Sequence, residues 1–234
     1  MDWKTASNYN YLDELDGTQW AWEFLRRNPD YIKDYTWFIA NWYELELRYG
    51  KAPDRDYNAW KKDPLSFKKS VIDDEVLQIE SWMEQKWGFY KFPLDPKMNA
   101  VKTQGKIAWR EQVKDAIIIN DDNITDYLLH DTRIGLGFDT ALPLKSQLEH
   151  AQKTLIFMQK QLKKNHPEKF CTINNHRLRW TDYLRMLDGI RTDKKQVVAM
   201  ELGYSHDELE DSLTEAFRLR DHDYLCLPDL PLKI

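Results

Sequence analysis

The first fifty residues place apolar side chains at helical spacing. A first helix is predicted to be capped by Asp16 or Thr18, to run through Phe24 and Leu25 and to end by Asn28. Pro29 suits the first turn of a second helix, which we expect to stop at Gly50 because glycine commonly follows a helix. The second helix has one apolar face, made by Tyr31, Tyr35, Phe38, Trp42 and Leu45.

The hydrophobic pattern changes in the middle of the chain. Residues 52–67 are typical of a loop, which leads into a predicted helix over about 73–86. Three later runs are short, rich in β-branched or aromatic residues and bounded by turn residues. They predict strands at 89–92, 116–119 and 133–138. We therefore expect a small central β-sheet in a chain that is otherwise helical.

A long helix with a regular apolar seam is predicted after Pro143. The seam alternates steps of four and three residues through Leu144, Leu148, Ala151, Leu155, Met158 and Leu162. Such a seam packs either against a helix of another subunit or against the chain's own core. Ile156 and Phe157 widen the apolar face, which favours the chain's own core.

The C-terminal region combines an amphipathic helix with a turn signal. The helix is predicted over 179–190. Beyond it, Ala199, Gly203 and Leu209 stand at the spacing of a helix-turn-helix. In that motif a small residue lets the helices cross closely, glycine takes the turn, and an apolar residue packs the second helix onto the first. An ordinary helical hairpin is the alternative.

These elements predict an α+β fold that is predominantly α-helical. We expect an aromatic-rich N-terminal helical module over 1–60, a mixed segment of helix and small β-sheet over 61–142, and a C-terminal helical domain over 143–234. The C-terminal domain, with its helix-turn-helix-like element, is the candidate DNA-binding domain.

Composition excludes several classes of protein. Aromatic residues make up 13% of the 234 residues, with only 8 Gly and 9 Pro, which excludes a disordered or low-complexity chain. Cys171 and Cys226 match no metal or redox spacing and are expected to be free thiols. The N-terminus lacks a secretion signal, and no apolar run approaches a bilayer span. We expect a cytoplasmic protein that does not enter a membrane.

Charge is distributed unevenly along the chain. The net charge of −5 argues mildly against nucleic-acid binding. Residues 1–60 carry −4 and residues 61–140 carry −2, whereas residues 141–195 hold 12 basic and 5 acidic side chains, which gives +7. Residues 196–234 return to −6. One basic segment therefore lies between acidic ones.

The basic segment supplies the candidate DNA contacts. These are Lys163, Lys164, Lys169, Arg177, Arg179, Arg191, Lys194 and Lys195. A solvated basic face is the alternative. The second helix of the helix-turn-helix is a poor candidate because Asp207, Glu208, Glu210 and Asp211 would face phosphates.

Catalytic and metal-binding motifs are missing. There is no phosphate-binding glycine loop of the Walker type, and the six histidines form no metal-ligand spacing. Asp121, Asp122 and Asp126 would suit a nuclease-type metal site, but a solvated turn is favoured. We expect no catalytic residue, no metal, no cofactor and no enzyme activity.

Six of the ten tryptophans lie in residues 1–60. They would suit a platform for bases or peptides, but aromatic residues at helical spacing more often form the core and a self-association surface. The residues predicted to assemble subunits are Trp20, Trp22, Trp37, Trp42, Leu148 and Leu155.

One stretch is specific enough to indicate a family. Residues 20–31 read Trp-Ala-Trp-Glu-Phe-Leu-Arg-Arg-Asn-Pro-Asp-Tyr, and residues 9–13 before them read Tyr-Asn-Tyr-Leu-Asp. Suggestive matches follow at 87–89, 108–110, 143–148 and 183–188. Together they resemble a proteobacterial transcriptional-regulator-like family found in integrative elements, whose members end in an uncharacterised DNA-binding domain.

The resemblance implies sequence-specific binding to double-stranded promoter DNA by a homo-oligomer, with a hexamer as the expected assembly. Family members tend to carry arginines in the last helix, where this chain has Glu208, Glu210 and Asp211. We therefore expect the acidic helix to engage a neighbouring subunit or RNA polymerase.

Three hypotheses follow. The first is an oligomeric transcriptional activator without catalytic activity, whose basic segment contacts phosphate. The second is a protein-binding regulator, such as an anti-activator, that does not contact DNA. The third is a metal-dependent nuclease, which would need Asp121 or Asp122.

Overall fold

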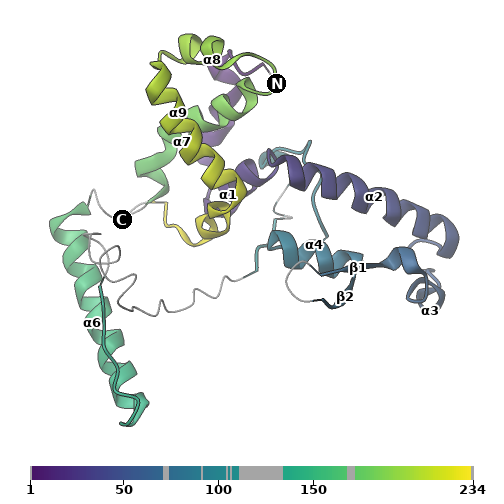
Figure 1. The fold of residues 1–234 in the computed structure, drawn as a ribbon, viewed down its shortest axis with the longest axis horizontal. Coiled ribbons are helices and arrows are strands. Elements are labelled where there is room, and N and C mark those ends of the chain that lie inside the picture. The colour runs from purple at the N-terminus through teal and green to yellow at the C-terminus, as the bar shows by residue number, and fades with distance from the viewer. Residues whose placement is uncertain are drawn as a thin grey trace. The chain divides into compact units, whose positions relative to one another are not determined.

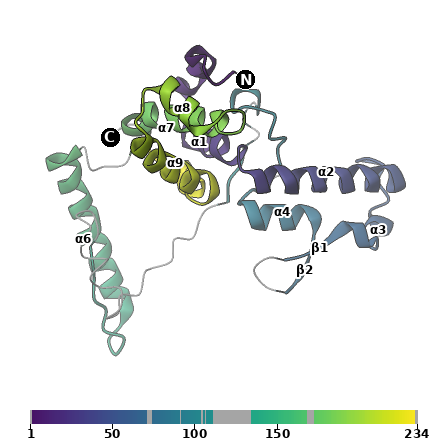
Figure 2. The same cartoon turned by 45° about the horizontal axis from the view of Figure 1, so that its top comes forward.

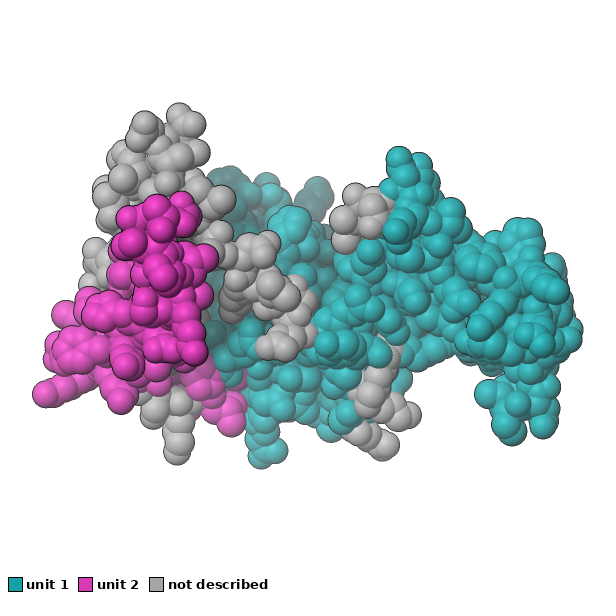
Figure 3. Space-filling view, turned by 90° about the horizontal axis from the view of Figure 1, so that it is seen from below, with its two compact units in different colours: residues 1–112, 176–230 teal, residues 113–175, 231–234 magenta. Residues whose placement is uncertain are grey.

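The computed structural model describes most of the chain, in two compact units. The described residues are 2–70, 74–90, 92–103, 105, 107–110, 134–167 and 172–232. Unit 1 comprises residues 1–112 and 176–230, and unit 2 comprises residues 113–175 and 231–234 (Figure 3). Unit 1 thus combines the N-terminal half of the chain with its C-terminal helices. The sequence predicted three consecutive segments instead.

The structure confirms the predicted α+β, predominantly helical fold (Figure 1). The first half of the chain forms η1 (Ala6–Glu14), α1 (Gly17–Leu25), α2 (Pro29–Tyr49), α3 (Tyr57–Trp60), η2 (Pro64–Ser66), β1 (Phe67–Lys69), β2 (Val76–Gln78), α4 (Ile79–Trp87) and η3 (Val101–Thr103). The second half forms α6 (Leu144–Asn165), α7 (Ile173–Gly189), α8 (Lys195–Leu202), α9 (His206–Asp221) and η5 (Asp223–Asp229).

Local capping groups position the first two helices as predicted. The Asp16 side chain accepts a hydrogen bond from the Gln19 amide at 2.8 Å, and the Gln19 side chain accepts one from the Asp16 amide, which completes a capping box. Asn28 caps α2 and Pro29 occupies its first turn. Gly50 ends α2 with a φ of 83°, a left-handed value that favours glycine.

The sheet is not where the sequence placed it. β1 and β2 pair antiparallel, with Phe67 opposite Gln78 and Lys69 opposite Val76. The helix predicted from about residue 73 therefore begins only at Ile79, because the preceding residues form a strand. The loop predicted over 52–67 contains α3 and η2.

Two of the predicted strands are wrong. In the run 89–92, Phe89 forms only an isolated bridge with Trp109, and the Phe92 ring turns to the aromatic cluster around Trp42, 4.8 Å away. Residues 134–138 have no regular structure, because the described part of the chain supplies no partner strand for them. The third predicted strand, 116–119, lies outside the described residues.

The predicted long helix is present as α6, but it buries none of its residues. Leu148 is 56% exposed and Leu155 is 45% exposed. The expectation that the seam packs on the chain's own core is therefore wrong for the part of the chain that the structure describes.

The core of unit 1 forms around α1. This helix packs against η5 and α9, while α4 runs along α2 (Figures 1 and 2). Gly17 at the start of α1 lies so close to η5 that a side chain there would collide with the Leu227 carbonyl. Trp20 meets Trp180 of α7 edge-on at 5.4 Å, and the Trp22 indole donates to the Met98 carbonyl at 2.9 Å.

These contacts change the role expected for the tryptophans. Trp20 and Trp22 are completely buried, so neither offers a surface to another subunit in this fold. Trp37 packs on Trp82 at 5.6 Å, and Trp42 packs on Trp60 at 4.9 Å. A lysine and an arginine, Lys68 and Arg55, lie over these two pairs of rings. We therefore assign Trp20 and Trp22 to packing within the chain, whereas the assembly role of the partly buried Trp37 and Trp42 stays a prediction.

A buried ion network joins α1 to α7. Arg27 donates to both carboxylate oxygens of Asp188, at 2.9 and 2.8 Å, and to a Glu23 carboxylate oxygen at 2.6 Å. The Tyr9 hydroxyl donates to Asp188 at 2.7 Å, and the Ala100 amide donates to Glu23 at 2.7 Å. The network thus ties together η1, α1, the loop before η3 and the end of α7.

The network keeps both carboxyl groups charged. Burial raises the pKa of Asp188 and of Glu23. The Arg27 guanidinium and the hydrogen bonds lower it by more than burial raises it, so both pKa values lie below their ordinary values. The pKa of Arg27 is raised well above its ordinary value, because the effect of the two carboxylates exceeds that of burial.

Replacing Arg27 should strongly destabilise unit 1. In Arg27→Met, Asp188 stays buried without its counter-charge and Glu23 keeps only Arg26; leaving a buried charge unpaired typically costs about 3–5 kcal/mol. Tryptophan fluorescence during urea unfolding measures the change. Arg218→Met is the control, because Arg218 is 58% exposed and binds two exposed carboxylates, Glu215 and Asp223, so its loss should be much smaller. Equal losses in the two variants would contradict the role of the network.

Stability should also fall in acid because of these carboxyl groups. A carboxyl whose pKa is lowered by folding stabilises the protein above its ordinary pKa, and this contribution is lost as the pH drops through the lowered value. We expect the free energy of unfolding to decrease below about pH 4. Asp188→Asn should be less stable than the wild type near neutral pH and should lose less stability in acid. Urea unfolding at several pH values tests this, and parallel curves would argue against it.

Candidate nucleic-acid interface

The turn between α8 and α9 is built by its own residues. Gly203 has a φ of 76°, and the Tyr204 amide donates to the Ala199 carbonyl at 2.9 Å, which forms a Schellman motif at the end of α8. Ser205 then caps α9 through a capping box with Glu208. Leu209 is completely buried. Two helices are therefore joined by a three-residue turn, a feature that a helix-turn-helix and an ordinary helical hairpin share.

Polar contacts hold α9 and the turn to the rest of the C-terminal helices. Lys195 at the start of α8 donates to both carboxylate oxygens of Glu210 on α9, at 2.8 Å each. The Tyr204 hydroxyl donates to Asp182 of α7 at 3.1 Å. The positions of α7, α8 and α9 are thus linked by side chains as well as by the buried core.

The acidic groups of α9 remain charged. A hydrogen bond from Ser205 lowers the pKa of Glu208, and one from Lys195 lowers the pKa of Glu210. Asp207 and Asp211 are also exposed. The leading turns of α9 are therefore negative at neutral pH, which is unfavourable for a helix in the major groove.

The predicted basic residues are distributed over several elements. Arg177 and Arg179 lie near the start of α7, and Arg191 follows its end, so 14 residues of chain place these groups about 21 Å apart along the helix. Lys163 and Lys164 stand in the last turn of α6, which belongs to unit 2. Lys169 lies outside the described residues.

The basic residues of unit 1 also differ in whether their side chains are already engaged by other groups of the protein or can contact phosphate. Lys195 is bound to Glu210, and Arg177 is half-buried and has interactions within the protein. Arg179, Arg191 and Lys194 are exposed, and none of the three forms an ion pair with another described residue. These three are the strongest candidates for contact with phosphate.

The N-terminal segment positions the loop that carries Arg191 and Lys194. The Trp3 indole donates to Asp193 at 2.9 Å, and Lys4 approaches the same carboxylate at 3.7 Å. Gly189 lies directly against the Trp3 ring. The orientation of the loop between α7 and α8 therefore depends on the first residues of the chain.

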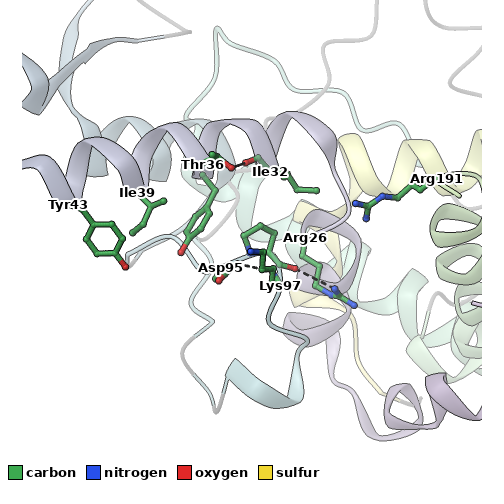
Figure 4. A pocket seen from close by; sticks show the side chains of 10 residues that line it. Arg26, Ile32, Thr36, Ile39, Tyr43, Asp95, Lys97 and Arg191 are labelled. Carbon is green, nitrogen blue, oxygen red and sulfur yellow. Dashed lines mark hydrogen bonds between the residues drawn. The ribbon is translucent and has the colours of Figure 1, made fainter. Parts of the chain in front are cut away.

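Three further basic residues lie near Arg191 that sequence reasoning missed. Arg26, Lys97 and Lys102 line a cavity of about 510 Å³ together with Arg191 (Figure 4 shows three of the four). These cations come from three distant stretches of sequence, so no periodicity or motif could have grouped them.

The remaining candidate residues from the sequence are the acidic residues of a metal site and the two cysteines. Within the described ranges, no three histidine, cysteine or acidic side chains are arranged to hold a metal ion. Asp121, Asp122, Asp126 and Cys171 lie outside those ranges, and Cys226 is an exposed free thiol. None of the helices that can be described is long and apolar enough to cross a membrane.

Comparison with known proteins agrees with the N-terminal signature. Residues 2–61 match the model of the proteobacterial transcriptional regulator-like domain. Neither a curated protein nor a solved structure gives a significant match. The matched segment contains η1, α1 and α2, including Glu23 and Arg27 of the ion network, and it indicates a regulatory role for the chain.

Proposed function

We propose that this protein is a DNA-binding transcriptional activator that acts at a promoter as a homo-oligomer. The observation that carries the proposal is the regulator-like match over residues 2–61. Arg27 of that segment is bound to Asp188 of α7, which connects the matched segment to the helix that carries Arg179. The exposed cations Arg179, Arg191 and Lys194 are the proposed phosphate contacts.

We also propose a more specific identity within the regulator-like family. The sequence looks most like RovC, a hexameric activator of type VI secretion genes, and this resemblance implies a hexamer and a promoter of that class. Weak basic patches suit such an assembly, because several subunits on one DNA molecule raise the effective concentration of each patch.

In this proposal α6 assembles the subunits. Its seam is exposed at Leu148 and Leu155, and coiled-coil helices bury such a seam against one another. The acidic α9 then remains available for a neighbouring subunit or RNA polymerase.

A protein-binding regulator is the second candidate function. The negative leading turns of α9 favour it, because Asp207, Glu208 and Asp211 would suit a basic partner protein. Such a regulator would bind no promoter fragment at low salt.

DNA binding should depend on the exposed cations. Arg179→Ala and Lys194→Ala should each weaken promoter binding, and each should reduce the slope of log affinity against log salt concentration by about one. Gel-shift titrations at several salt concentrations measure both quantities. Lys51→Ala is the control, since Lys51 is 75% exposed but lies at the far end of α2. Unchanged affinity and slope in both test variants would remove the assignment.

Assembly should depend on the α6 seam. The double variant Leu148→Glu and Leu155→Glu places charges in the proposed interface and should convert the oligomer into smaller species. Sedimentation or mass photometry measures the mass. The matched control is Lys153→Glu with Lys160→Glu, which adds the same residues on the opposite face of the heptad. A wild-type monomer, or equal masses for both double variants, would contradict the role of α6.

A further inference from the structure

A concave basic site lies in unit 1, away from α9. Arg26 stands at the end of α1, Lys97 and Lys102 flank the start of η3, and Arg191 follows α7. These four residues line a cavity of about 510 Å³, to which Asn99 and Thr192 add polar side chains.

Three of the four cations have no acidic partner among the residues that the structure describes. Arg26 is bound to Glu23 at 2.7 Å, and Asp188 at the cavity wall is already bound to Arg27. Lys97, Lys102 and Arg191 are exposed and form no ion pair with any other described residue. The cavity therefore holds uncompensated positive charge, which attracts an anion.

An apolar wall adjoins this charge. A second cavity of about 550 Å³ shares Arg26, Lys97 and Arg191 with the first and extends along α2 (Figure 4). Its wall comes from residues at helical spacing, namely Ile32, Tyr35, Thr36, Ile39 and Tyr43.

This stripe is separate from the face of α2 that enters the core. Tyr31, Phe38 and Leu45 are completely buried, whereas Tyr43 is 61% exposed. Figure 4 places Tyr43 and Ile39 at one end of the cavity and Arg191 at the other. Both volumes lie in the range of small-molecule sites, about 300–1,000 Å³.

One ligand would satisfy both halves of the site. A phosphate group fits Lys97, Lys102 and Arg191, since lysine and arginine are the common phosphate partners in proteins. A flat aromatic body fits the wall of α2, where Tyr43 offers a ring for stacking. Asp95 lies between the two halves and can accept hydrogen bonds from such a body.

We propose that these joined cavities bind a nucleoside triphosphate, which is long enough to place its phosphates among Lys97, Lys102 and Arg191 and its base against Ile39 and Tyr43. Arg191 is itself a proposed DNA contact and shares the loop between α7 and α8 with Lys194, so a ligand held by Arg191 would compete with DNA for this residue. Binding of the nucleotide itself does not depend on the proposed function.

Calorimetric titration of the full chain without DNA tests the site. AMP, GMP and ATP are titrated separately, with inorganic phosphate as the probe of the basic half. We expect ATP to bind more tightly than AMP and GMP, and Lys97→Ala and Arg191→Ala each to weaken it by about tenfold or more, as for the loss of a charge-assisted hydrogen bond. Lys51→Ala, with a thermal unfolding curve recorded for every variant, is the control.

Tyr43→Ala separates the two halves of the site. It should weaken nucleotide binding and leave the affinity for inorganic phosphate unchanged. The proposal is overturned if no nucleotide binds, if the double variant of Lys97 and Arg191 binds as the wild type does, or if Tyr43→Ala has no effect on nucleotide affinity. Promoter binding that persists while nucleotide binding is absent would reject this inference and leave the proposed function standing.

Discussion

The fold of unit 1 depends on one buried guanidinium. Arg27 is 3% exposed and binds Glu23 and Asp188, two carboxylates that are separated by 165 positions in the sequence. A buried charge is tolerated only when its partners are in place, because the Coulombic attraction and hydrogen bonds must offset the loss of hydration. The regulator-like segment and α7 therefore pack together in unit 1, and the position of η1 through Tyr9 and of the loop at Ala100 follows from contacts with the same two carboxylates.

This constraint gives the N-terminal signature a physical meaning. The stretch 20–31 supplies Trp20 and Trp22 to the core and Arg27 to the ion network, and Asn28 and Pro29 start α2. In this structure the signature therefore holds the fold together. The residues with chemistry to offer a ligand, such as Lys97, Arg179 and Lys194, lie outside that stretch, on surfaces that the network positions.

Sequence reasoning succeeded where a short stretch determines the geometry. Asp16, Pro29 and Gly50 mark where helices begin or end, because each acts through its immediate neighbours. Gly203 and Ser205 specify the turn before α9 within three residues. It failed where contacts between distant segments determine the structure. The strands of the β1–β2 pair are three residues each, too short to show alternation. Helical periodicity gave Trp20 and Leu148 the same apolar pattern, but Trp20 is completely buried against Trp180 whereas Leu148 is 56% exposed. The basic cavity was out of reach because Arg26, Lys97 and Arg191 meet only once the fold has formed.

The loop between α7 and α8 carries a residue of the proposed nucleotide site, Arg191, and a proposed DNA contact, Lys194. Asp188 and Asp193 anchor the residues around Arg191 from both sides, through Arg27 and through Trp3. Between these anchors Arg191 faces the cavity, and one residue beyond them Lys194 caps α8 and faces solvent. A loop fixed at two points has few ways to respond to a ligand, so a bound anion would act mainly by restricting Arg191 and Thr192. Any effect on Lys194 would then come from the loop's reduced freedom, because a rigid loop loses less conformational entropy when it meets DNA.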